Sequence, residues 1–241
     1  MTTDSFTQAI EPSRPPRQTN WVLVSLYGFA LIWVAIVLAF SIFQPIKVLP
    51  RVSLAPGFVF TNQDGDRRTS EDYRGKLAVY SFTYADCKDR CIQTTPQMQS
   101  LRNALDLAPA MAVGVTLATI TVNPEKDMNE SWSQFAAPYL VNSKSKIPWD
   151  FLTGDPTRTR YIVGGGFSVF YQKDAAEVVS KLDPRFVLVD GWGIIRAEYR
   201  SELLDVSLVM RDIAYLEEEI RNSKGVARFA YEAAHLFRCY P

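Results

Sequence analysis

The sequence predicts an α/β fold, a mixed sheet with flanking helices, preceded by one N-terminal transmembrane helix. Two observations carry this prediction. Short apolar runs typical of buried strands alternate with stretches of helical periodicity, and the order ends on a hairpin and a helix. Ahead of them, Trp21 to Phe43 contains no charged residue and is about as long as a bilayer requires.

Composition narrows the class of protein. The chain has 241 residues, and subtracting a tail and a membrane segment leaves one domain of ordinary size. Basic and acidic residues balance at 26 each, with no basic stripe and no interleaving of aromatic and basic residues, so we expect no nucleic-acid partner. Three cysteines are too few for a disulfide scaffold.

The N-terminal region is predicted in three parts. Residues 1–20 are polar and rich in Pro, Thr and Ser, and we expect them to be disordered. Residues 21–43 are predicted to span the membrane; a cleaved signal peptide is the main alternative, but its apolar core would be shorter. A buried soluble helix is the least favoured interpretation. Residues 44–56 are a proline-containing linker.

The main domain is predicted over residues 57–224. Residues 58–65 form a short strand closed by an Asp-Gly turn, and a second turn at 72–76 leads into an apolar strand at 77–83. Further strands are predicted from β-branched or aromatic runs at 113–122 and 149–153, and as a hairpin around a Gly-Trp-Gly turn at 186–199.

The helices are predicted from apolar periodicity and capping residues. They cover 95–107, 129–140, 156–171 with a glycine break at 164–166, 201–222, and 226–237 within a C-terminal extension at 225–241. Strands and helices in this order suit a thioredoxin-like arrangement, with helices on both faces of the sheet.

Two cysteines, Cys87 and Cys91, lie in a short loop between the strand at 77–83 and the following helix. A helix N-terminus favours thiolate, which is the reactive form for disulfide exchange and the ligand form for Cu(I). A structural disulfide or inert core thiols are the alternative. The charged neighbours of the two cysteines indicate a solvated loop instead: Asp86, Lys88, Asp89 and Arg90.

Several short segments around these cysteines form a wider pattern. They are Asn62–Gly65, Asp72–Lys76, Ser81–Tyr84, Pro124-Glu125, Phe151–Gly154 and Phe186–Asp190. Together with the CxxxC spacing and the single anchor, they resemble the Sco/SenC family over residues 58 to about 223. Members of that family are membrane-anchored, thioredoxin-like factors of cytochrome c oxidase assembly.

The resemblance implies a site and partners. Cys87 and Cys91 take the positions of the two cysteines that bind copper in the family together with one distant histidine. The family delivers copper to the dinuclear copper centre of the oxidase or reduces its cysteines. The implied partners are the membrane and cytochrome c oxidase or another respiratory complex, and the implied cofactor is copper or none.

The sequence departs from the family at a copper ligand, because the histidine position falls on Leu182. Leucine has no lone pair, so the usual site of two sulfurs and one nitrogen cannot form. Two thiolates can still hold Cu(I) or alternate between dithiol and disulfide. Milder departures are Lys88 and Ile92, where the family has proline, and Asn123, where it has an acidic residue.

The only histidine, His235, lies four residues before the third cysteine, Cys239. On a helix the two would share a face, which suggests a replacement metal site at Cys87 and Cys91. An amphipathic tail helix packed on the domain or on a partner is the simpler interpretation. Cys239 can also pair between chains.

Three functional hypotheses remain. The first is a Sco-like, membrane-anchored oxidase assembly factor that acts by dithiol/disulfide exchange, with possible copper handling, at Cys87 and Cys91. The second is a non-catalytic subunit of a respiratory membrane complex with a degenerate copper site. The third is a general thiol–disulfide oxidoreductase, the one enzyme class considered. The thiols favour a single-pass protein with its main domain on the non-cytoplasmic side, although the charges flanking the span give a near tie.

Overall fold

The structure is a computed structural model that describes residues 20–43, 46–111, 113–140, 144–174, 179–223, 225, 227–237 and 240. The chain divides into two compact units, Met1–Pro45 and Ile46–Pro241. The polar tail predicted at residues 1–20 lies outside the described residues except for Asn20.

In the first unit, the described residues form one helix, α1 (Trp21–Phe43), with the predicted bounds. An 18-residue window of this 23-residue helix has a mean hydropathy of 2.5, and none of its residues is buried. At 1.5 Å per residue the helix is about 35 Å long, enough to cross the hydrocarbon core of a bilayer. By length and composition, α1 is therefore a candidate membrane span.

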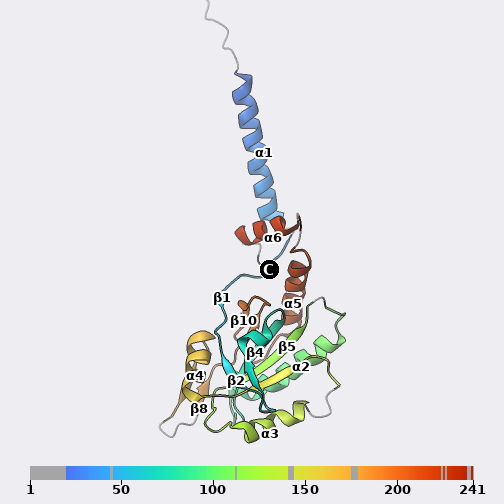
Figure 1. The fold of residues 1–241 in the computed structure, drawn as a ribbon. Helices are drawn as coiled ribbons and strands as arrows, with labels where there is room; N and C mark the ends of the chain where they lie inside the picture. The colour runs from blue at the N-terminus through green and yellow to red at the C-terminus, as the bar shows by residue number, and fades with distance from the viewer. Residues whose placement is uncertain are drawn as a thin grey trace, which may run out of the picture. The chain divides into compact units, whose positions relative to one another are not determined.

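The second unit is built on a six-stranded sheet with the order β1-β10-β9-β4-β5-β6 (Figure 1). Its strands are β1 (Ser53–Leu54), β4 (Leu77–Thr83), β5 (Val115–Thr121), β6 (Trp149–Leu152), β9 (Phe186–Val189) and β10 (Ile194–Tyr199). β4 pairs parallel with β5 and antiparallel with β9. The sheet is mixed, as predicted.

All seven residues of β4 are buried because both faces of the sheet are covered. Successive side chains of a strand point to opposite faces. Ala78, Tyr80 and Phe82 accordingly join one apolar cluster, and Leu77 and Val79 join the other. This is why β4 is mostly apolar and does not alternate between apolar and charged residues.

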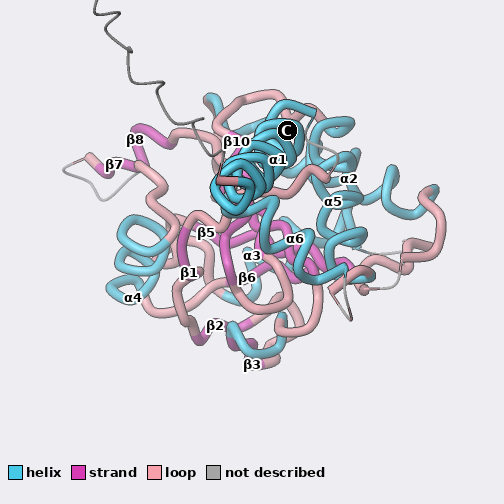
Figure 2. Tube along the Cα trace, turned by 90° about the horizontal axis from the view of Figure 1, so that it is seen from above, coloured by secondary structure: helices cyan, strands magenta, loops and turns pink. Residues whose placement is uncertain are grey.

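Different elements cover the two faces. The face of Leu77 is covered by α2 (Thr94–Leu107), α3 (Asn129–Leu140) and α5 (Val206–Arg221). The face of Tyr80 is covered by α4 (Pro156–Arg160), the π-helical turn η3 (Tyr161–Gly166), the hairpin of β2 (Val59–Thr61) and β3 (Arg67–Thr69), and the hairpin of β7 (Tyr171–Lys173) and β8 (Val179–Leu182). In Figure 2, α4 and α5 lie on opposite sides of the strands. Two short 3₁₀ turns also occur in the described part of the unit, η1 (Ser70–Tyr73) and η2 (Arg90–Gln93).

The helix predicted over residues 156–171 is wrong beyond Gly166. The helical segment ends there, where three consecutive glycines weaken it. Tyr171 instead begins β7, which pairs with β8 through Tyr171 and Leu182. Another predicted helix begins later than expected, at Val206, because Asp205 caps it by accepting the Leu208 N–H at 3.1 Å.

Part of the predicted linker belongs to the domain. Val48 and Leu49 are buried, and β1 pairs with β10 at the edge of the sheet. The buried guanidinium of Arg196 holds this segment by donating to the carbonyl oxygens of Leu49 (2.8 Å) and Pro50 (3.1 Å). Such a segment is fixed to the domain, because its backbone oxygens accept bonds from a buried cation.

The same guanidinium connects two acidic residues. Arg196 pairs with Asp190 at 3.0 Å and with Glu219 of α5 at 2.7 Å. Burial opposes ionisation of Glu219, but its bonds to His235 and Arg196 lower its pKa below the ordinary value. Removing one partner would leave a buried charge without compensation.

The C-terminal extension contains α6 (Ala227–Leu236). It packs on α5 through the buried Tyr231, whose hydroxyl accepts a hydrogen bond from Asn222 at 3.0 Å. His235 bonds to Glu219 at 3.0 Å. The predicted tail helix is therefore present and packed on the domain.

The first testable prediction concerns α1. We expect the full-length chain to stay in the membrane fraction after an alkaline carbonate wash, because about 20 apolar residues partition strongly into hydrocarbon. Immunoblotting of pellet and supernatant checks this. A shortened chain in the supernatant would show instead that the segment is removed as a signal peptide.

Candidate thiol–disulfide site

The CxxxC motif lies at the carboxyl end of β4, the central strand. Thr83 ends β4, and the chain then turns through a short loop into η2, which runs directly into α2. Cys87 lies in the loop and Cys91 within η2. The two form a disulfide, with their Cα atoms 6.0 Å apart.

The two sulfurs differ in accessibility. Cys91 is 2% exposed and belongs to the same apolar cluster as Tyr80 and Phe82. Cys87 is half-buried and packs against that cluster from outside. An incoming thiolate therefore reaches Cys87 more easily than Cys91. Attack at Cys87 would release Cys91 as a thiolate beside the start of α2, where the helix dipole stabilises negative charge.

Arg90 ties the motif loop to two other segments. It forms ion pairs with Glu202, in the loop before α5, and with Asp183, the latter at 3.1 Å. The hydrogen bond with Glu202 raises the pKa of Arg90. These groups are exposed, so the pairs add little stability. Their effect is to place the motif loop beside the segment that follows β8.

Leu182 is the last residue of β8 and is 3% exposed. It belongs to the same apolar cluster as Cys91, against which Cys87 also packs. Its neighbour Asp183 is the residue that pairs with Arg90 of the motif loop. The structure therefore brings the position predicted to hold the family's histidine into the cluster beneath the disulfide, and that position presents an aliphatic side chain.

His235 is not near the motif. It bonds to Glu219, which bonds to Arg196 and so connects to Asp190. Asp190 follows β9, whose Val189 pairs with Ala78 at the beginning of β4. The motif follows the other end of β4, about 20 Å away at 3.3 Å per residue. The replacement-ligand hypothesis is therefore not supported for His235, and Cys239 lies outside the described residues.

The donor set does not form a complete metal site as the structure presents it. Within the described parts of the chain, no group of three or more His, Cys, Asp or Glu side chains could hold a metal ion. The two motif sulfurs are bonded to each other. Copper binding here therefore requires prior reduction of the disulfide, and it would rest on two thiolates.

A buried carboxylate, which the sequence analysis did not single out, lies under the motif loop. Asp127 accepts the Ala85 N–H with both oxygens, at 3.3 and 3.2 Å, and the hydroxyl of Thr121 also donates to it. Burial raises its pKa to about 6, opposed by these hydrogen bonds. Its place in the sequence, just after a buried parallel strand adjacent to the cysteine-bearing strand, could have indicated it.

The milder departures from the family lie nearby. Lys88, on the motif loop, and Ile92, in η2, are both exposed. Lys88 adds a charged side chain to the surface near Cys87, and Ile92 adds an apolar one. Asn123 is 2% exposed, and its backbone N–H donates to the Thr121 hydroxyl at 3.0 Å. Thr121 thus links Asn123 to Asp127.

A cleft of about 770 Å³ opens next to the end of β5. Val122, on its wall, donates its N–H to the carbonyl oxygen of Thr83 at the end of β4, so the cleft is one strand away from the motif loop. Two exposed aromatic rings, Tyr161 and Phe170, and the basic residue Arg160 also line it. A cleft of this size can accept several side chains of another molecule.

Known proteins resemble this chain in sequence. The sequence model of the SCO1/SenC family matches residues 48–214. The SCO1 protein homolog of Bacillus subtilis (strain 168) is 32% identical over 97 residues, which cover 40% of this chain and 47% of that protein. The mitochondrial SCO2 homolog of Danio rerio is 32% identical over 85 residues, covering 35% and 30%. The matched stretches thus span less than half of either relative.

Solved structures resemble the fold. BsSco, described as a member of the Sco family of cytochrome c oxidase assembly proteins with a disulfide switch, has a TM-score of 0.60 at 23% identity over 71% of this chain and 98% of its own. Copper-bound ScoI of Arabidopsis thaliana has a TM-score of 0.57 at 20% identity, covering 70% and 99%. These likenesses confirm the predicted thioredoxin-like fold.

The second testable prediction concerns Asp127. Its raised pKa means that the folded state binds this proton more tightly than the unfolded state, whose pKa is near 4. Protonated Asp127 thus stabilises the folded state below about pH 4, and this stabilisation is lost as pH rises through about 6. The free energy of unfolding should change by about 3 kcal/mol over this range. In Asp127→Asn, the free energy of unfolding should fall less over this range than in the wild type.

Urea unfolding of the detergent-solubilised chain at both ends of this pH range measures the difference. Asp89→Asn, which removes another exposed carboxylate from the motif loop, is the matched control and should keep the pH-dependent change of the wild type. Parallel pH curves for Asp127→Asn and the wild type would contradict the assignment.

Proposed function

The chain belongs to the SCO1/SenC family, and from this membership we propose that it is a membrane-anchored factor for cytochrome c oxidase assembly. It acts by dithiol/disulfide exchange at Cys87 and Cys91. The partner is the oxidase or another respiratory complex. Copper handling at the same cysteines is a secondary activity of the reduced form.

One observation carries this proposal. The two cysteines form a disulfide in which one sulfur is half-exposed and the other is buried. In exchange, a partner thiolate attacks Cys87, the Cys87–Cys91 bond breaks, and Cys91 leaves with the electron pair. A second partner thiolate then displaces Cys87, so the partner gains a disulfide and this protein a dithiol. In reverse, the dithiol reduces a partner disulfide.

We propose copper binding only as the secondary activity because of Leu182. Relatives such as Arabidopsis thaliana ScoI have been solved with copper bound, which supports metal handling as a property to test in this chain. Here the buried Leu182 contributes no lone pair to the cluster beneath the cysteines. Two thiolates can hold Cu(I) by themselves, but with one ligand fewer than a site completed by imidazole.

The proposed topology is a single pass through α1 with the second unit on the non-cytoplasmic side. Two observations support it: α1 has the length and composition of a span, and the motif cysteines are paired. Stable disulfides are typical of compartments outside the reducing cytosol.

A second function is favoured by one specific feature. α6 lies beyond the part of the chain that the family model matches, which ends at residue 214. An added helix together with an aliphatic residue at position 182 would suit a structural subunit of a respiratory complex in which the copper site has been lost. The cysteines distinguish the two functions, because a structural subunit does not need them to react.

The third prediction tests exchange in cells that need this chain for oxidase assembly. Cys87→Ser and Cys91→Ser should each reduce assembled oxidase to the level of the deletion, because either change prevents the disulfide. Oxidase activity in membranes and immunoblots of this chain are the measurements. Cys239→Ser, which removes the third cysteine, is the control and should behave as the wild type. Normal assembly in both motif variants would favour the structural subunit.

The fourth prediction concerns Leu182. In the reduced protein, Leu182→His should strengthen copper binding at least about tenfold, or about 1.4 kcal/mol, because imidazole adds a third ligand to two thiolates that their loop already holds together. The gain should be larger for Cu(II), which two thiolates alone reduce. Burial of an imidazole in place of leucine should cost about 2–3 kcal/mol of stability.

Competition titrations with a copper chelator measure the affinity. Lys181→His is the matched control: it adds the same side chain one residue earlier, on the exposed face of β8, and should leave affinity unchanged. Equal affinities for Leu182→His and the wild type, both folded, would refute the ligand-position argument.

A further inference from the structure

We infer that the second unit contacts the lipid bilayer through the exposed apolar side of α6. The contacting surface, here called the linker edge, is formed by residues 47–51, the turn at 190–193 and α6. This inference rests on the proposed membrane anchor. Beyond the anchor, we infer a lipid-binding surface on the second unit, and the edge of the domain opposite this surface then faces away from the membrane.

The tether, here the segment between Phe43 and Val48, is short. The apolar helix α1 ends at Phe43, and Val48 is already buried in the second unit. Five residue steps separate these positions and span at most about 18 Å when fully extended. If α1 crosses a bilayer, the surface around Val48 must lie within about that distance of the hydrocarbon boundary.

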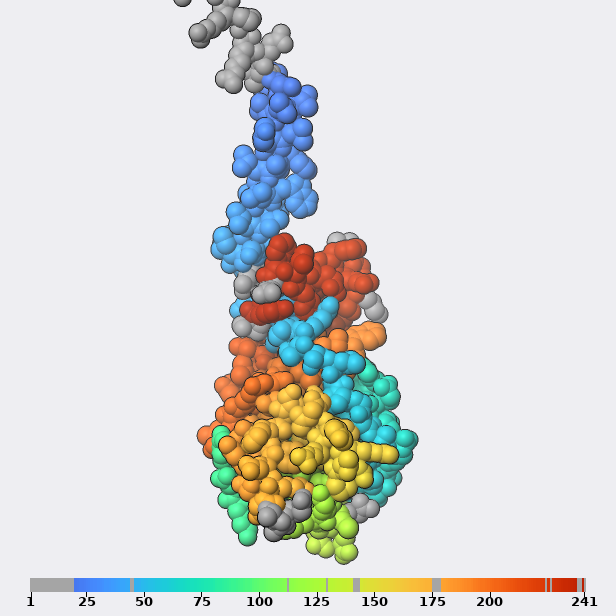
Figure 3. Space-filling view, turned by 90° about the vertical axis from the view of Figure 1, so that its left-hand side faces the viewer, coloured from blue at the N-terminus to red at the C-terminus, as the bar shows by residue number. Residues whose placement is uncertain are grey.

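α6 belongs to the same surface as Val48. Arg51, three residues after Val48, pairs with Glu232 of α6 at 3.3 Å. Arg196 bonds to the carbonyl oxygens of residues 49 and 50 and to Glu219, and Glu219 bonds to His235 of α6. In Figure 3 the red α6 lies beside the light-blue residues of this linker segment. The same short tether that limits Val48 therefore limits α6.

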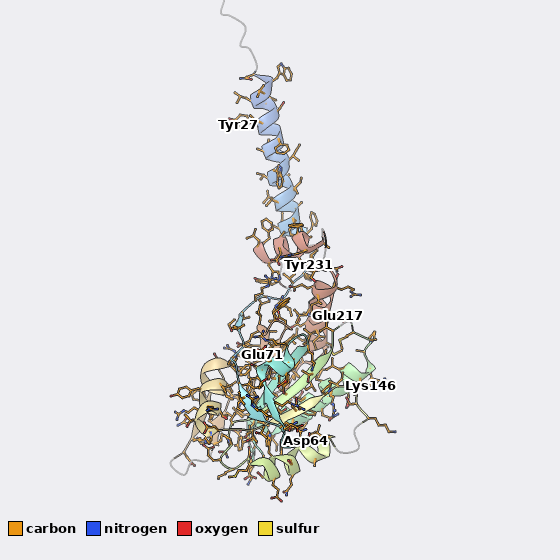
Figure 4. The ribbon with its side chains drawn as sticks, in the orientation of Figure 1. Tyr27, Asp64, Glu71, Lys146, Glu217 and Tyr231 are labelled. Carbon is orange, nitrogen blue, oxygen red and sulfur yellow. A yellow bond between two sulfur atoms is a disulfide. The ribbon has the colours of Figure 1, made fainter. Side chains whose placement is uncertain are left out.

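Buried side chains and polar contacts hold α6 on the domain. One side of the helix is fixed: Tyr231, labelled in Figure 4, and Ala234 are buried. Tyr231 bonds to Asn222, and His235 and Glu232 bond to groups outside α6. Because three polar contacts set its rotation about its own axis, the opposite side of α6 points outward in a defined orientation.

That outward side carries two large apolar residues. Phe229 is 75% exposed and Leu236 is 77% exposed. They are seven residues apart, two turns of helix, so they lie on one face. Trp192, in the turn between β9 and β10, is 79% exposed, and this turn is connected to the linker through the pair of Asp190 with Arg196. Tryptophan is favoured at membrane interfaces. Large exposed apolar groups gathered in one region indicate an interaction site.

A bilayer is the occupant that fits these observations. It is present at this distance whenever the protein is anchored, whereas a protein partner would have to enter the narrow space allowed by the tether. An amphipathic helix that lies in the interface and buries its apolar face at the headgroup boundary is a known mode of membrane contact. Both charge signs occur on the linker edge, as Arg228 and Glu232 show, so the apolar contact carries the proposal.

The contact has a consequence for the proposed function. β4 starts at the linker edge and ends at the motif loop, about 20 Å away for seven residues. With the linker edge on the bilayer, the Cys87–Cys91 disulfide faces away from the membrane. A partner must then present its thiols at least about 20 Å above the lipid surface, in a domain outside the bilayer.

The test uses the full chain reconstituted in phosphatidylcholine–phosphatidylglycerol vesicles. In a Cys239→Ser background, Phe229→Cys and Leu236→Cys are each labelled with an environment-sensitive fluorophore, while the motif cysteines stay protected as their disulfide. Leu203→Cys is the matched control. Leu203 is a leucine like Leu236, and its exposure of 66% is similar. It lies next to Glu202, which pairs with the motif loop at the opposite edge. Quenching by lipids that carry a nitroxide is measured at each site.

We expect blue-shifted emission and several-fold stronger lipid quenching at positions 229 and 236 than at position 203. Equal quenching at all three sites, with the chain retained after a carbonate wash, overturns the inference and leaves the anchor intact. A blue shift without lipid quenching also overturns it, because a protein surface then covers α6. Loss of the chain from the vesicles overturns both the inference and the proposed anchor. Because two positions are labelled separately, a disturbance of α6 by one substitution does not decide the outcome. Circular dichroism checks that each variant is folded.

Discussion

The burial of β4 on both faces is the constraint on which the rest of the domain depends. All seven of its residues pair with β5, residues 78–81 also pair with β9, and its apolar side chains alternate between two clusters. A shift of one residue would exchange Tyr80 and Val79 between clusters that differ in shape, so the register is fixed. One end of the strand thereby lies near the buried Arg196 and its ion pairs with Asp190 and Glu219, and the other end leads into the loop with the cysteines.

The chemistry at the presented end follows from what lies beneath it. Cys91 and Leu182 share an apolar cluster, while Asp127, with its raised pKa, holds the backbone of the motif loop through Ala85. The described residues offer no third donor here, and we therefore propose that this apolar cluster favours alternation between disulfide and dithiol over a stable copper site. Membership of the SCO1/SenC family is compatible with both uses, and in the proposed function Leu182 is the residue that favours disulfide exchange over copper binding.

The sequence predicted the features that depend on local pattern. The long apolar helix, β4 and the CxxxC loop were recovered because continuous apolarity and motif spacing need no knowledge of distant residues. The β7–β8 hairpin was missed, because its short strands are stabilised by packing of Val179 and Leu182 on the core. The spacing of His235 and Cys239 suggested a metal site, whereas the partner of His235 is Glu219 on another helix, a contact that spacing cannot reveal. Asp127 was not identified from the sequence, because burial of a carboxylate depends on tertiary structure.

The proposed function requires that Cys87 and Cys91 form a reversible two-electron couple in the folded protein. Equilibration of the intact protein with graded mixtures of reduced and oxidised dithiothreitol, followed by acid quenching, alkylation and mass spectrometry, measures it most directly. The account predicts one transition in which both cysteines gain or lose the label together while circular dichroism stays unchanged. A disulfide that resists reduction until the protein unfolds, or two cysteines that stay reduced under every mixture, would contradict it.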